Sequence, residues 1–323
     1  MVEFHTIFSA GHTAVAGIGM GFNVLLFYLA LFQTPKAIQT YAVLIVNFAI
    51  TDFFACFFDM FVQQRIIPVG WTLGYVSNGF CTHFDPTTCY VGYSLMLHFL
   101  THSSWSLLLS FSYRCYILFY QAPSRRMLSF IIFLIYIPSF IQFFSFLWAQ
   151  DDPKEIMKIF HDKFPEYNLT GATVTGTKNI LCFSALYTIL YIALSITPMY
   201  MGILMLRRTI IRRLSYQGTD ISKETKGLHS QLLMALTYQA VLPGFFFFSV
   251  ASYAIGQLGI YNHPALEYFT FSCFIFIPFL SPLASFIFVT PYRKFILGAV
   301  GRKGAVVEPR GSNTFNPYSI SNK

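Results

Sequence analysis

Charged side chains are scarce in this sequence. Asp, Glu, Lys and Arg make up 11% of its 323 residues, against roughly 25% in an ordinary soluble domain. Apolar residues make up 55%, with 38 Phe and 20 Tyr, and this is more apolar surface than one water-facing shell can hide. The composition therefore excludes a soluble globule and indicates a chain that lies in the lipid bilayer.

Long apolar runs take up most of the chain. A helix needs about 20 apolar residues to cross a hydrocarbon core roughly 30 Å thick. Seven windows reach that length, at residues 9–32, 41–62, 87–113, 127–149, 180–206, 231–255 and 267–290. We therefore predict an all-α bundle of seven transmembrane helices over residues 1–294, followed by a disordered cytoplasmic tail over residues 295–323.

Basic residues are unevenly distributed between the loops. With the N-terminus outside the cell, the inner segments hold 16 of the 21 Lys and Arg residues and the outer segments hold 5, which is the bias of cytoplasmic loops. The net charge of +8 is thus a sign of topology and of attraction to anionic lipids, and not of nucleic-acid binding. No basic residue precedes the first run, so we expect no cleaved signal peptide. The sequon at Asn168 falls in an outer loop and is the predicted glycosylation site.

Few ionisable residues interrupt the predicted spans. An ionised Asp52 at mid-span would cost roughly 2.5 to 3.5 kcal/mol, so its side chain should face other helices, whereas Asp59 is interpreted as a solvated carboxylate near the outer water. His98 and His102 have the spacing of a shared metal site, but membrane di-iron enzymes need more histidines, so packing or pocket lining is favoured. Ser94 lies one turn before His98 without an acid to orient the ring, which disfavours a hydrolase. No metal or cofactor is predicted.

A series of motifs resembles the rhodopsin-like seven-helix receptors that couple to G proteins. The matching residues, in order, are Gly21-Phe22-Asn23-Val24-Leu25, Thr34-Pro35, Asn47-Phe48-Ala49-Ile50-Thr51-Asp52, Tyr113-Arg114-Cys115, one proline in each later helix (Pro198, Pro243 and Pro282), and Tyr292-Arg293-Lys294. The resemblance implies hinges at the three prolines, a short amphipathic eighth helix, and a heterotrimeric G protein as partner.

Several standard residues of that pattern are replaced. Tyr113 stands in place of the acid before Arg114, Ala240-Val241 in place of a Cys-Trp pair, and residues 281–285 in place of Asn-Pro-x-x-Tyr. The seventh span lacks Lys, which excludes a retinal Schiff base, and the third span lacks an acid, which removes the counter-ion for an amine. The pattern is therefore neither that of an opsin nor that of an amine receptor.

A closer resemblance is to the nematode serpentine chemoreceptors, of class delta. It is carried by residues 34–41, 47–54, 63–68, 86–95 and 106–114. It implies a receptor, not an enzyme, that binds a small odorant or pheromone-like molecule in the plasma membrane of sensory neurons and their cilia. The alternative is a small transporter or channel with a path lined by Asp52, Asp59 and His98. The lack of an internal repeat counts against a transporter built from two matching halves.

The ligand is expected to contact the outer halves of the third, fifth, sixth and seventh spans. The candidate residues are Tyr93, Leu97, His98, Tyr187, Phe247 and Phe271. A cavity lined by such side chains suits a small, mostly apolar molecule with one or two hydrogen-bonding groups.

A polar cluster is expected deeper in the bundle, formed by Asn23, Asp52, Ser103 and Ser281. In rhodopsin-like receptors the corresponding oxygens can hold a sodium ion, and a water-filled cluster without an ion is the equally open alternative.

The inner end of the bundle is rich in arginine. Arg114 lacks a neighbouring acid, so its partners are expected among backbone carbonyls, the hydroxyls of Tyr113 or Tyr116, and lipid phosphates. The run that contains Arg207, Arg208, Arg212 and Arg213 is interpreted either as positive-inside charge or as a surface that contacts the G protein.

The resemblance also implies a disulfide between Cys89 and the second outer loop. That loop, residues 150–179, contains no Cys. Cys81 and Cys182 are the other cysteines expected on the oxidising side of the membrane. Pairing with Cys182 is slightly favoured because it would close a long loop.

Overall fold

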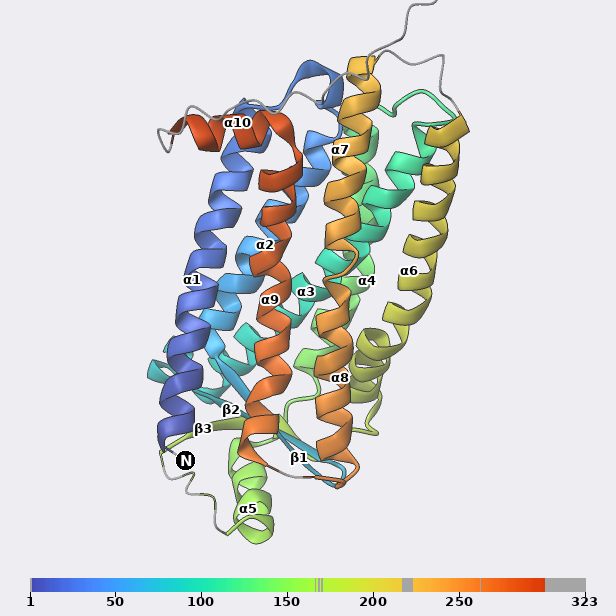
Figure 1. Ribbon diagram of the computed structural model, residues 1–323. Coiled ribbons are helices and arrows are strands. Elements are labelled where there is room, and N and C mark those ends of the chain that lie inside the picture. Colours follow the sequence, from blue (N-terminus) through green and yellow to red (C-terminus); the bar gives the residue numbers. More distant parts are fainter. Residues whose placement is uncertain are drawn as a thin grey trace, which may run out of the picture.

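Long helices run side by side through the molecule (Figure 1). The computed structural model describes residues 2–165, 167, 169, 171–216, 223–261 and 263–299. The long helices are α1 (Val2–Phe32), α2 (Ala42–Val62), α3 (Pro86–Tyr116), α4 (Arg125–Leu147), α6 (Phe183–Tyr216), α7 (Lys223–Gln239) with α8 (Pro243–Gln257), and α9 (Pro264–Phe288). With α7 and α8 taken together, they coincide with the seven predicted spans, which confirms the seven-helix class.

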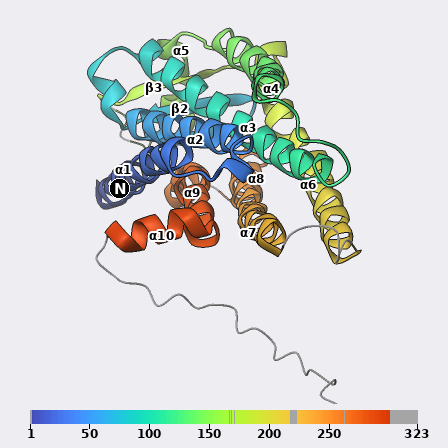
Figure 2. The same cartoon turned by 90° about the horizontal axis from the view of Figure 1, so that it is seen from above.

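Helix α3 is less apolar than a typical membrane span. Within the described residues, six helical stretches are long and apolar enough to cross a membrane, and α3 is not among them. Most of its residues are nevertheless buried, because α2, α4 and α6 pack around it, and Figure 2 shows α3 beside α2 in the view along the helices. A helix enclosed by protein can carry Ser, Thr and His without exposing them to lipid.

Prolines affect the later helices to different degrees. Helix α6 continues through Pro198, and α9 continues through Pro278 and Pro282. Pro243 instead is the first residue of α8, after a turn that follows Gln239. Proline cannot donate the backbone hydrogen bond that a continuous helix needs, and here the predicted sixth span is divided into two helices.

An antiparallel sheet covers one end of the bundle, which was not expected from the sequence. Strands β1 (Gln64–Val69) and β2 (Thr72–Ser77) form a hairpin, and β3 (Thr173–Thr177), from the connection between α4 and α6, pairs with β2. The hairpin turn contains Gly70 at a φ of +56°, which is the left-handed region that glycine adopts without strain. We refer to this end of the bundle as the sheet end.

The sheet has apolar contacts on both faces. Ile66, Leu73 and Tyr75 belong to the core cluster of the helical bundle. The neighbouring positions, among them Ile67, pack with Phe160 of helix α5 (Pro153–Lys163). The alternation of side chains along a strand thus joins the bundle to α5 through the sheet.

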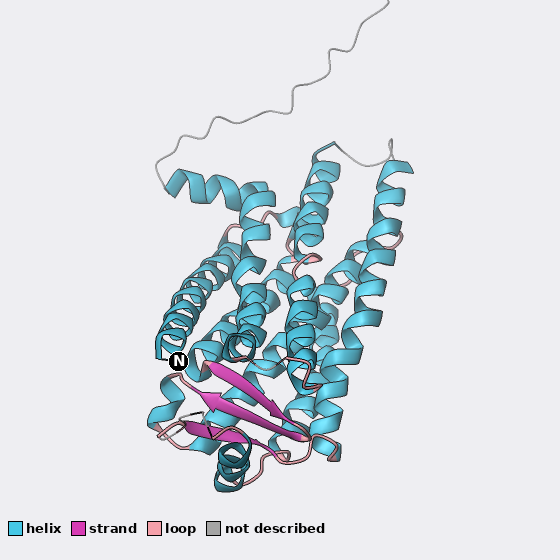
Figure 3. Ribbon diagram, turned by 60° about the horizontal axis from the view of Figure 1, so that its bottom comes forward, coloured by secondary structure: helices cyan, strands magenta, loops and turns pink. Residues whose placement is uncertain are grey.

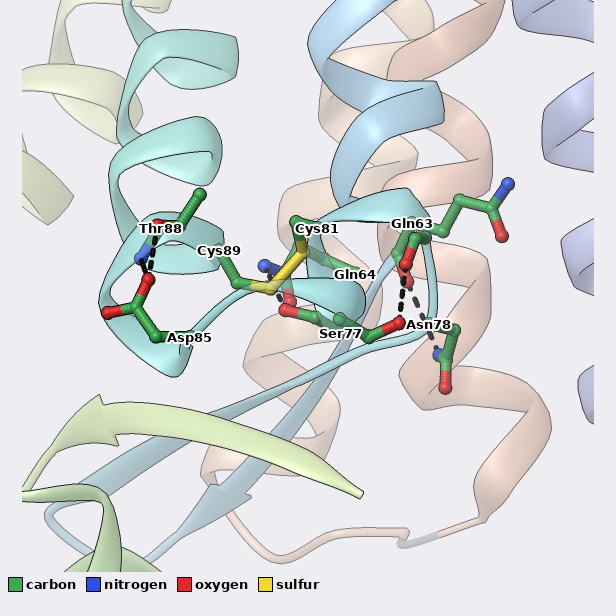
Figure 4. The surroundings of a disulfide bond; sticks show 10 residues. Gln63, Gln64, Ser77, Asn78, Cys81, Asp85, Thr88 and Cys89 are labelled. Carbon is green, nitrogen blue, oxygen red and sulfur yellow. Dashed lines mark hydrogen bonds between the residues drawn. A yellow bond between two sulfur atoms is a disulfide. The ribbon is translucent and has the colours of Figure 1, made fainter. Parts of the chain in front are cut away.

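A disulfide joins Cys81 to Cys89 (Figure 4). Cys81 lies in the short helix η2 (Phe80–His83), which follows β2 directly, and Cys89 lies in the first turn of α3. The preferred pairing with Cys182 is therefore wrong, because the hairpin and η2 bring Cys81 onto the start of α3, whereas Cys182 is a free thiol ahead of α6. Asp85 is the N-cap of α3, and hydrogen bonds from the Thr88 hydroxyl and amide hold the pKa of its carboxyl below the ordinary value.

A short helix, α10 (Thr290–Ala299), crosses the opposite end of the bundle (Figure 1). It is the predicted eighth helix. The Tyr292 hydroxyl and the Thr34 hydroxyl lie 2.6 Å apart and join it to the segment after α1. Helix α10 continues to Ala299, beyond residue 294 where the receptor domain was expected to end. The rest of the expected tail lies outside the described residues. We refer to this end as the α10 end.

Candidate functional site

A cavity of about 200 Å³ lies among the helices at the sheet end, where the strands extend across the helix ends (Figure 3). Its lining comes from the sheet (Ile66, Leu73, Tyr75), α3 (Tyr93, Leu97), α4 (Phe146), α6 (Thr188, Ile189, Ile192, Ala193), α8 (Ser249, Val250, Tyr253, Ala254) and α9 (Thr270, Phe271, Phe274). The described residues place no charged side chain in this lining. It is an apolar cavity whose polar groups are hydroxyls.

Most of these hydroxyls are already hydrogen-bonded within the protein. The Ser249 hydroxyl donates to the carbonyl oxygen of Thr270, and the Thr188 hydroxyl donates to the carbonyl oxygen of Ser184. No hydrogen bond joins the Tyr253 hydroxyl to any residue in the described part of the chain. Tyr253 is therefore the polar group of the cavity that a ligand can bind without breaking a bond inside the protein.

Tyr75 fills the side of the cavity formed by the sheet. Its side chain is 1% exposed, its ring centroid lies 4.6 Å from that of Tyr93, and the two hydroxyls are hydrogen-bonded to each other. Burial raises the pKa of Tyr75 well above its ordinary value, and the neighbouring phenols Tyr93 and Tyr90 raise it further. The phenol of Tyr75 therefore stays neutral at physiological pH.

Three of the six residues predicted to contact a ligand line this cavity: Tyr93, Leu97 and Phe271. The other three lie outside its lining. His98 is 1% exposed and faces α4, with its ring centroid 4.6 Å from that of Phe140. Phe247 is 48% exposed on the outside of α8. Tyr187 stacks between Phe183 and Tyr191 along α6.

Sequence reasoning missed the contribution of the sheet. Apolar residues on both sides of the Gly70-Trp71 turn are a hairpin signal, so the strands could have been found. Their alternation would then have separated Ile66 and Tyr75, which face the bundle, from Ile67, which faces α5. That Tyr75 meets Tyr93 could not be read from the sequence, because it depends on how the hairpin folds back over α3.

A buried ion pair joins the sheet to α9. Arg65 Nε donates to Glu267 Oε2 at 2.6 Å, and Nη2 of Arg65 lies 2.6 Å from the same oxygen. The Tyr167 hydroxyl donates to Glu267 Oε1 at 2.9 Å, and the guanidinium lies 4.9 Å from the centroid of the Tyr167 ring. Burial raises the pKa of Tyr167, and the Glu267 carboxylate raises it further. The pair holds β1, and with it one wall of the cavity, against α9.

The predicted polar cluster forms without one of its members. Asp52 Oδ1 accepts a hydrogen bond from the Ser103 hydroxyl at 2.7 Å, and the Ser281 hydroxyl lies close to the same carboxyl group. Gln239 extends the cluster, since its Nε2 donates to the Ser281 hydroxyl at 3.1 Å. In the ranges that the structure describes, no bond joins Asn23 to Asp52, and Asn23 instead donates to the carbonyl oxygens of Gly19 and Pro278.

Asp59 is not solvated, which corrects its interpretation. Its side chain is 3% exposed, and Asp59 Oδ2 lies 2.8 Å from Nδ1 of His12 in α1. Nε2 of the same histidine lies 3.1 Å from the Ser272 hydroxyl in α9. His12 was overlooked because it lies near the N-terminal end of the first apolar run, although a histidine in a predicted span is itself a signal.

The two histidines of α3 make separate contacts. His98 packs on α4 as described above, while His102 Nε2 lies 3.3 Å from Asn47 Oδ1 and 3.1 Å from the Ser106 hydroxyl. No group of three His, Cys, Asp or Glu side chains that could hold a metal occurs among the described residues.

Arg114 packs on an aromatic ring at the α10 end. Its guanidinium lies 4.0 Å from the centroid of Tyr41, the residue that precedes α2, and only 3% of the residue is exposed. Tyr41 was not among the expected partners. A cation over the face of an aromatic ring is attracted by the ring's quadrupole, so Tyr41 takes the place of the missing acid.

The other arginines of the α10 end lie along α6. Arg208 and Arg212 are exposed, whereas Arg207 and Arg213 are half-buried. Arg207 Nε donates to the Thr237 hydroxyl of α7 at 3.3 Å, and the guanidinium of Arg213 lies 5.0 Å from the ring centroid of Phe119. Asn168, the predicted glycosylation site, lies outside the described residues.

Residues 8–298 match the model of a protein family described as "Serpentine type 7TM GPCR chemoreceptor Srd". The chain is 43% identical to serpentine receptor class delta-19 of Caenorhabditis elegans over 292 residues, which cover 89% of this chain and 86% of that protein. It is 42% identical to class delta-18 over 291 residues, with the same coverage. It is 31% identical to class delta-1 over 296 residues, which cover 90% of this chain and 80% of that protein. Both of these relatives are also from C. elegans.

Proposed function

Because the chain belongs to the Srd family of serpentine seven-helix chemoreceptors, we propose that it detects a small neutral molecule bound in the cavity at the sheet end. The cavity carries this proposal: its lining is apolar, without a charged side chain among the described residues, and it offers the Tyr253 hydroxyl as a hydrogen-bonding group. A charged ligand would lose its hydration there without gaining a counter-ion. At about 200 Å³, the cavity is smaller than the roughly 300–1,000 Å³ of drug-sized sites, so the ligand is small.

The sheet end lies outside the cell in this proposal, and the α10 end lies in the cytoplasm. The support is the distribution of Lys and Arg over the loops, 16 at the inner side against 5 at the outer side, because cytoplasmic loops are enriched in basic residues. The receptor would then hold its cavity in the outer half of the plasma membrane of the cilia of a sensory neuron. Asn168 would be on the glycosylated side.

The α10 end is proposed to activate a heterotrimeric G protein. Arg208 and Arg212 expose positive charge on α6, and Arg114 is positioned by Tyr41 near the same end. A receptor shifts between two arrangements of its helices according to which one the ligand binds better. Movement of α3 relative to α2 would separate Arg114 from Tyr41 and make the guanidinium available to a partner.

The contacts of Asp52, Asp59 and His98 support a receptor over a transporter. A transport path lined by all three would require them to share one cavity. Instead, Asp52 bonds to α3, Asp59 pairs with α1, and His98 packs on α4. Each is buried in a different helix contact.

The proposal is tested in cells that express this chain together with a G-protein reporter. We expect neutral volatile alcohols, ketones or esters to activate it, and charged analogues of the same size not to. The Tyr253→Phe variant should weaken the response, while the matched change Tyr261→Phe, at an exposed position beyond α8, should leave it unchanged. A response that survives Tyr253→Phe and also Ser249→Leu, which fills the cavity, would contradict the location of the site.

A further inference from the structure

The cavity is closed at the end that faces the sheet. Ile66, Leu73 and Tyr75 form that wall, and none of them is more than 6% exposed. Three contacts hold this wall to the helices. The Arg65–Glu267 pair joins it to α9, and the Cys81–Cys89 disulfide joins the segment after β2 to α3. A hydrogen bond from the Gln257 side chain to the carbonyl oxygen of Gly70 joins the hairpin turn to α8. The hollow beside this wall is small: a pocket of about 10 Å³ between β1, α8 and α9 shares Ile66, Tyr253 and Thr270 with the cavity. It is too narrow to admit an organic ligand from the water above the sheet.

The cavity is open on a different side. Six of its lining residues are partly exposed, and all six belong to α6 and α8: Ile189, Ile192, Ala193, Val250, Tyr253 and Ala254. The lining residues from the sheet, α3, α4 and α9 are all buried. The cavity thus reaches the surface of the molecule between α6 and α8, and we refer to this gap between 189–193 and 250–254 as the lateral opening.

Helices α6 and α8 are loosely packed against each other. Helix α8 packs along α9, and α6 packs along α3 and α4, but α6 and α8 approach each other at few residues. Below the lateral opening, toward the α10 end, Tyr200 of α6 meets Phe247 of α8 edge to face, with ring centroids 6.3 Å apart. The Tyr200 and Phe247 rings thus bound the lateral opening toward the α10 end, and the sheet bounds it at the sheet end.

The lateral opening lies at the depth of the lipid tails. The stretches Phe183–Arg213 and Ser230–Gln257 are both long and apolar enough to span the membrane. Ile192 lies nine residues after Phe183, which is about 13 Å along the helix axis, and this places the opening inside the hydrocarbon rather than in the headgroups. The side chains beside it, such as Leu190 and Leu194, are exposed apolar groups that suit lipid.

From these observations we propose that the ligand enters from the bilayer, through the lateral opening between α6 and α8. The inference rests on the proposed function of the cavity and narrows the class of ligand: a neutral molecule that partitions into lipid and carries a hydroxyl or carbonyl group that the Tyr253 hydroxyl can bind. Tyr253 lies both in the cavity wall and at the opening, so it meets the polar group of the ligand on the way in.

The test uses two photoreactive probes on the full chain in lipid nanodiscs. One is a free aliphatic alcohol with a diazirine, and the other is the same alcohol joined by its tail to a phospholipid acyl chain, which keeps it in the bilayer. Labelled residues are mapped by mass spectrometry. Two variants, Ala193→Phe and Ala254→Phe, narrow the opening. Two controls, Leu194→Phe and Ala251→Phe, place the same ring on the exposed side of the same helices.

Both probes are expected to label Tyr253 and its neighbours in the natural chain. Labelling by both should fall about tenfold in the two narrowing variants, because a ring forced into the gap resists passage, and should be retained in the controls. Retention of the Cys81–Cys89 disulfide and a single size-exclusion peak verify that each variant is folded.

Each other result decides against the inference. Labelling of the cavity by the free alcohol but not by the tethered one would mean that ligands reach the cavity from water. Undiminished labelling of the Ala193→Phe and Ala254→Phe variants by the free alcohol would mean the same. Both results overturn the lateral route while leaving the cavity as the ligand site. Absence of cavity labelling by either probe in the natural chain would overturn the proposed ligand site itself, and the lateral route with it.

Discussion

Replacing Arg65 by Met is expected to release the sheet from α9. The substitution keeps most of the apolar length of the side chain but leaves the Glu267 carboxylate, 7% exposed, without its positive partner. Removing one member of a buried ion pair costs about 3–5 kcal/mol. The Tyr167 hydroxyl still donates to Glu267 Oε1, so we expect the lower end of that range.

The cost should appear as opening of the sheet, because the pair joins β1 to α9 and not the helices to one another. A destabilisation of about 3 kcal/mol corresponds to roughly a hundredfold increase in the open population, at tenfold for each 1.4 kcal/mol. Hydrogen–deuterium exchange of the backbone amides of β1 and β2 reports this population. Exchange in α1 and α2 should change little.

Two variants separate the ion pair from a general loss of stability. In the double variant Arg65→Met with Glu267→Met, no unpaired charge remains buried, so exchange should return most of the way to that of the natural chain. Lys178→Met removes an exposed pair with Glu155 at the same end and should have little effect, because exposed pairs contribute little. The reasoning fails if Arg65→Met leaves strand exchange unchanged, or if the double variant exchanges as fast as the single one.

Three further predictions concern the disulfide, Arg114 and Asp52. Peptide mapping without reduction should recover Cys81 linked to Cys89 and should find Cys182 as a thiol that reacts with maleimide; a peptide that links Cys89 to Cys182 would contradict the fold of the sheet end. Tyr41→Leu should raise ligand-independent signalling about two- to thirtyfold, since a cation–π contact contributes about 0.5–2 kcal/mol. Arg114→Ala should instead abolish G-protein activation with surface expression kept. Normal signalling by Arg114→Ala would mean that the arginine only anchors α3 at the lipid headgroups. Asp52→Asn should alter the response to ligand with surface expression kept, because it replaces the carboxyl group to which the Ser103 hydroxyl donates; an unchanged response would leave this cluster without a role in switching.

The helices were predictable because their signal is long and simple. About twenty mostly apolar residues specify a membrane span whatever the helix contacts. Helix α3 does not meet that criterion among the described residues, and its burial between α2, α4 and α6 accounts for its place in the bundle. The sheet was missed because its strands are short and come from two loops more than ninety residues apart, 64–77 and 173–177. The pairing of β2 with β3 is a long-range contact that no local pattern in either loop specifies.

The sequence predicted how deep in the bundle the cavity lies, but not all of the side chains that line it. The outer halves of α3 and α9 supply Tyr93, Leu97 and Phe271 to the cavity, as expected. The rotation of α6 and α8 about their axes could not be read from sequences that are apolar all round, so Tyr187 and Phe247 do not line it. The partners of charged groups were missed for a related reason. Arg114 meets Tyr41, and Asp59 meets His12, from helices far away in sequence.

The cavity and the α10 end are connected most directly through α8 and α9. Ser249 of α8 bonds to Thr270 of α9 at the cavity, and Gln239, the last residue of α7, bonds to Ser281 of α9 beside Asp52. Between these two contacts the backbone ladder is interrupted before Pro243, and a helix bends most easily where its hydrogen bonds are already missing. A ligand that displaces α8 at Tyr253 therefore acts on a segment whose connection to α7 is a turn, while the Gln239–Ser281 bond ties α7 to the Asp52 cluster. We therefore expect such a displacement to be taken up at the turn before Pro243.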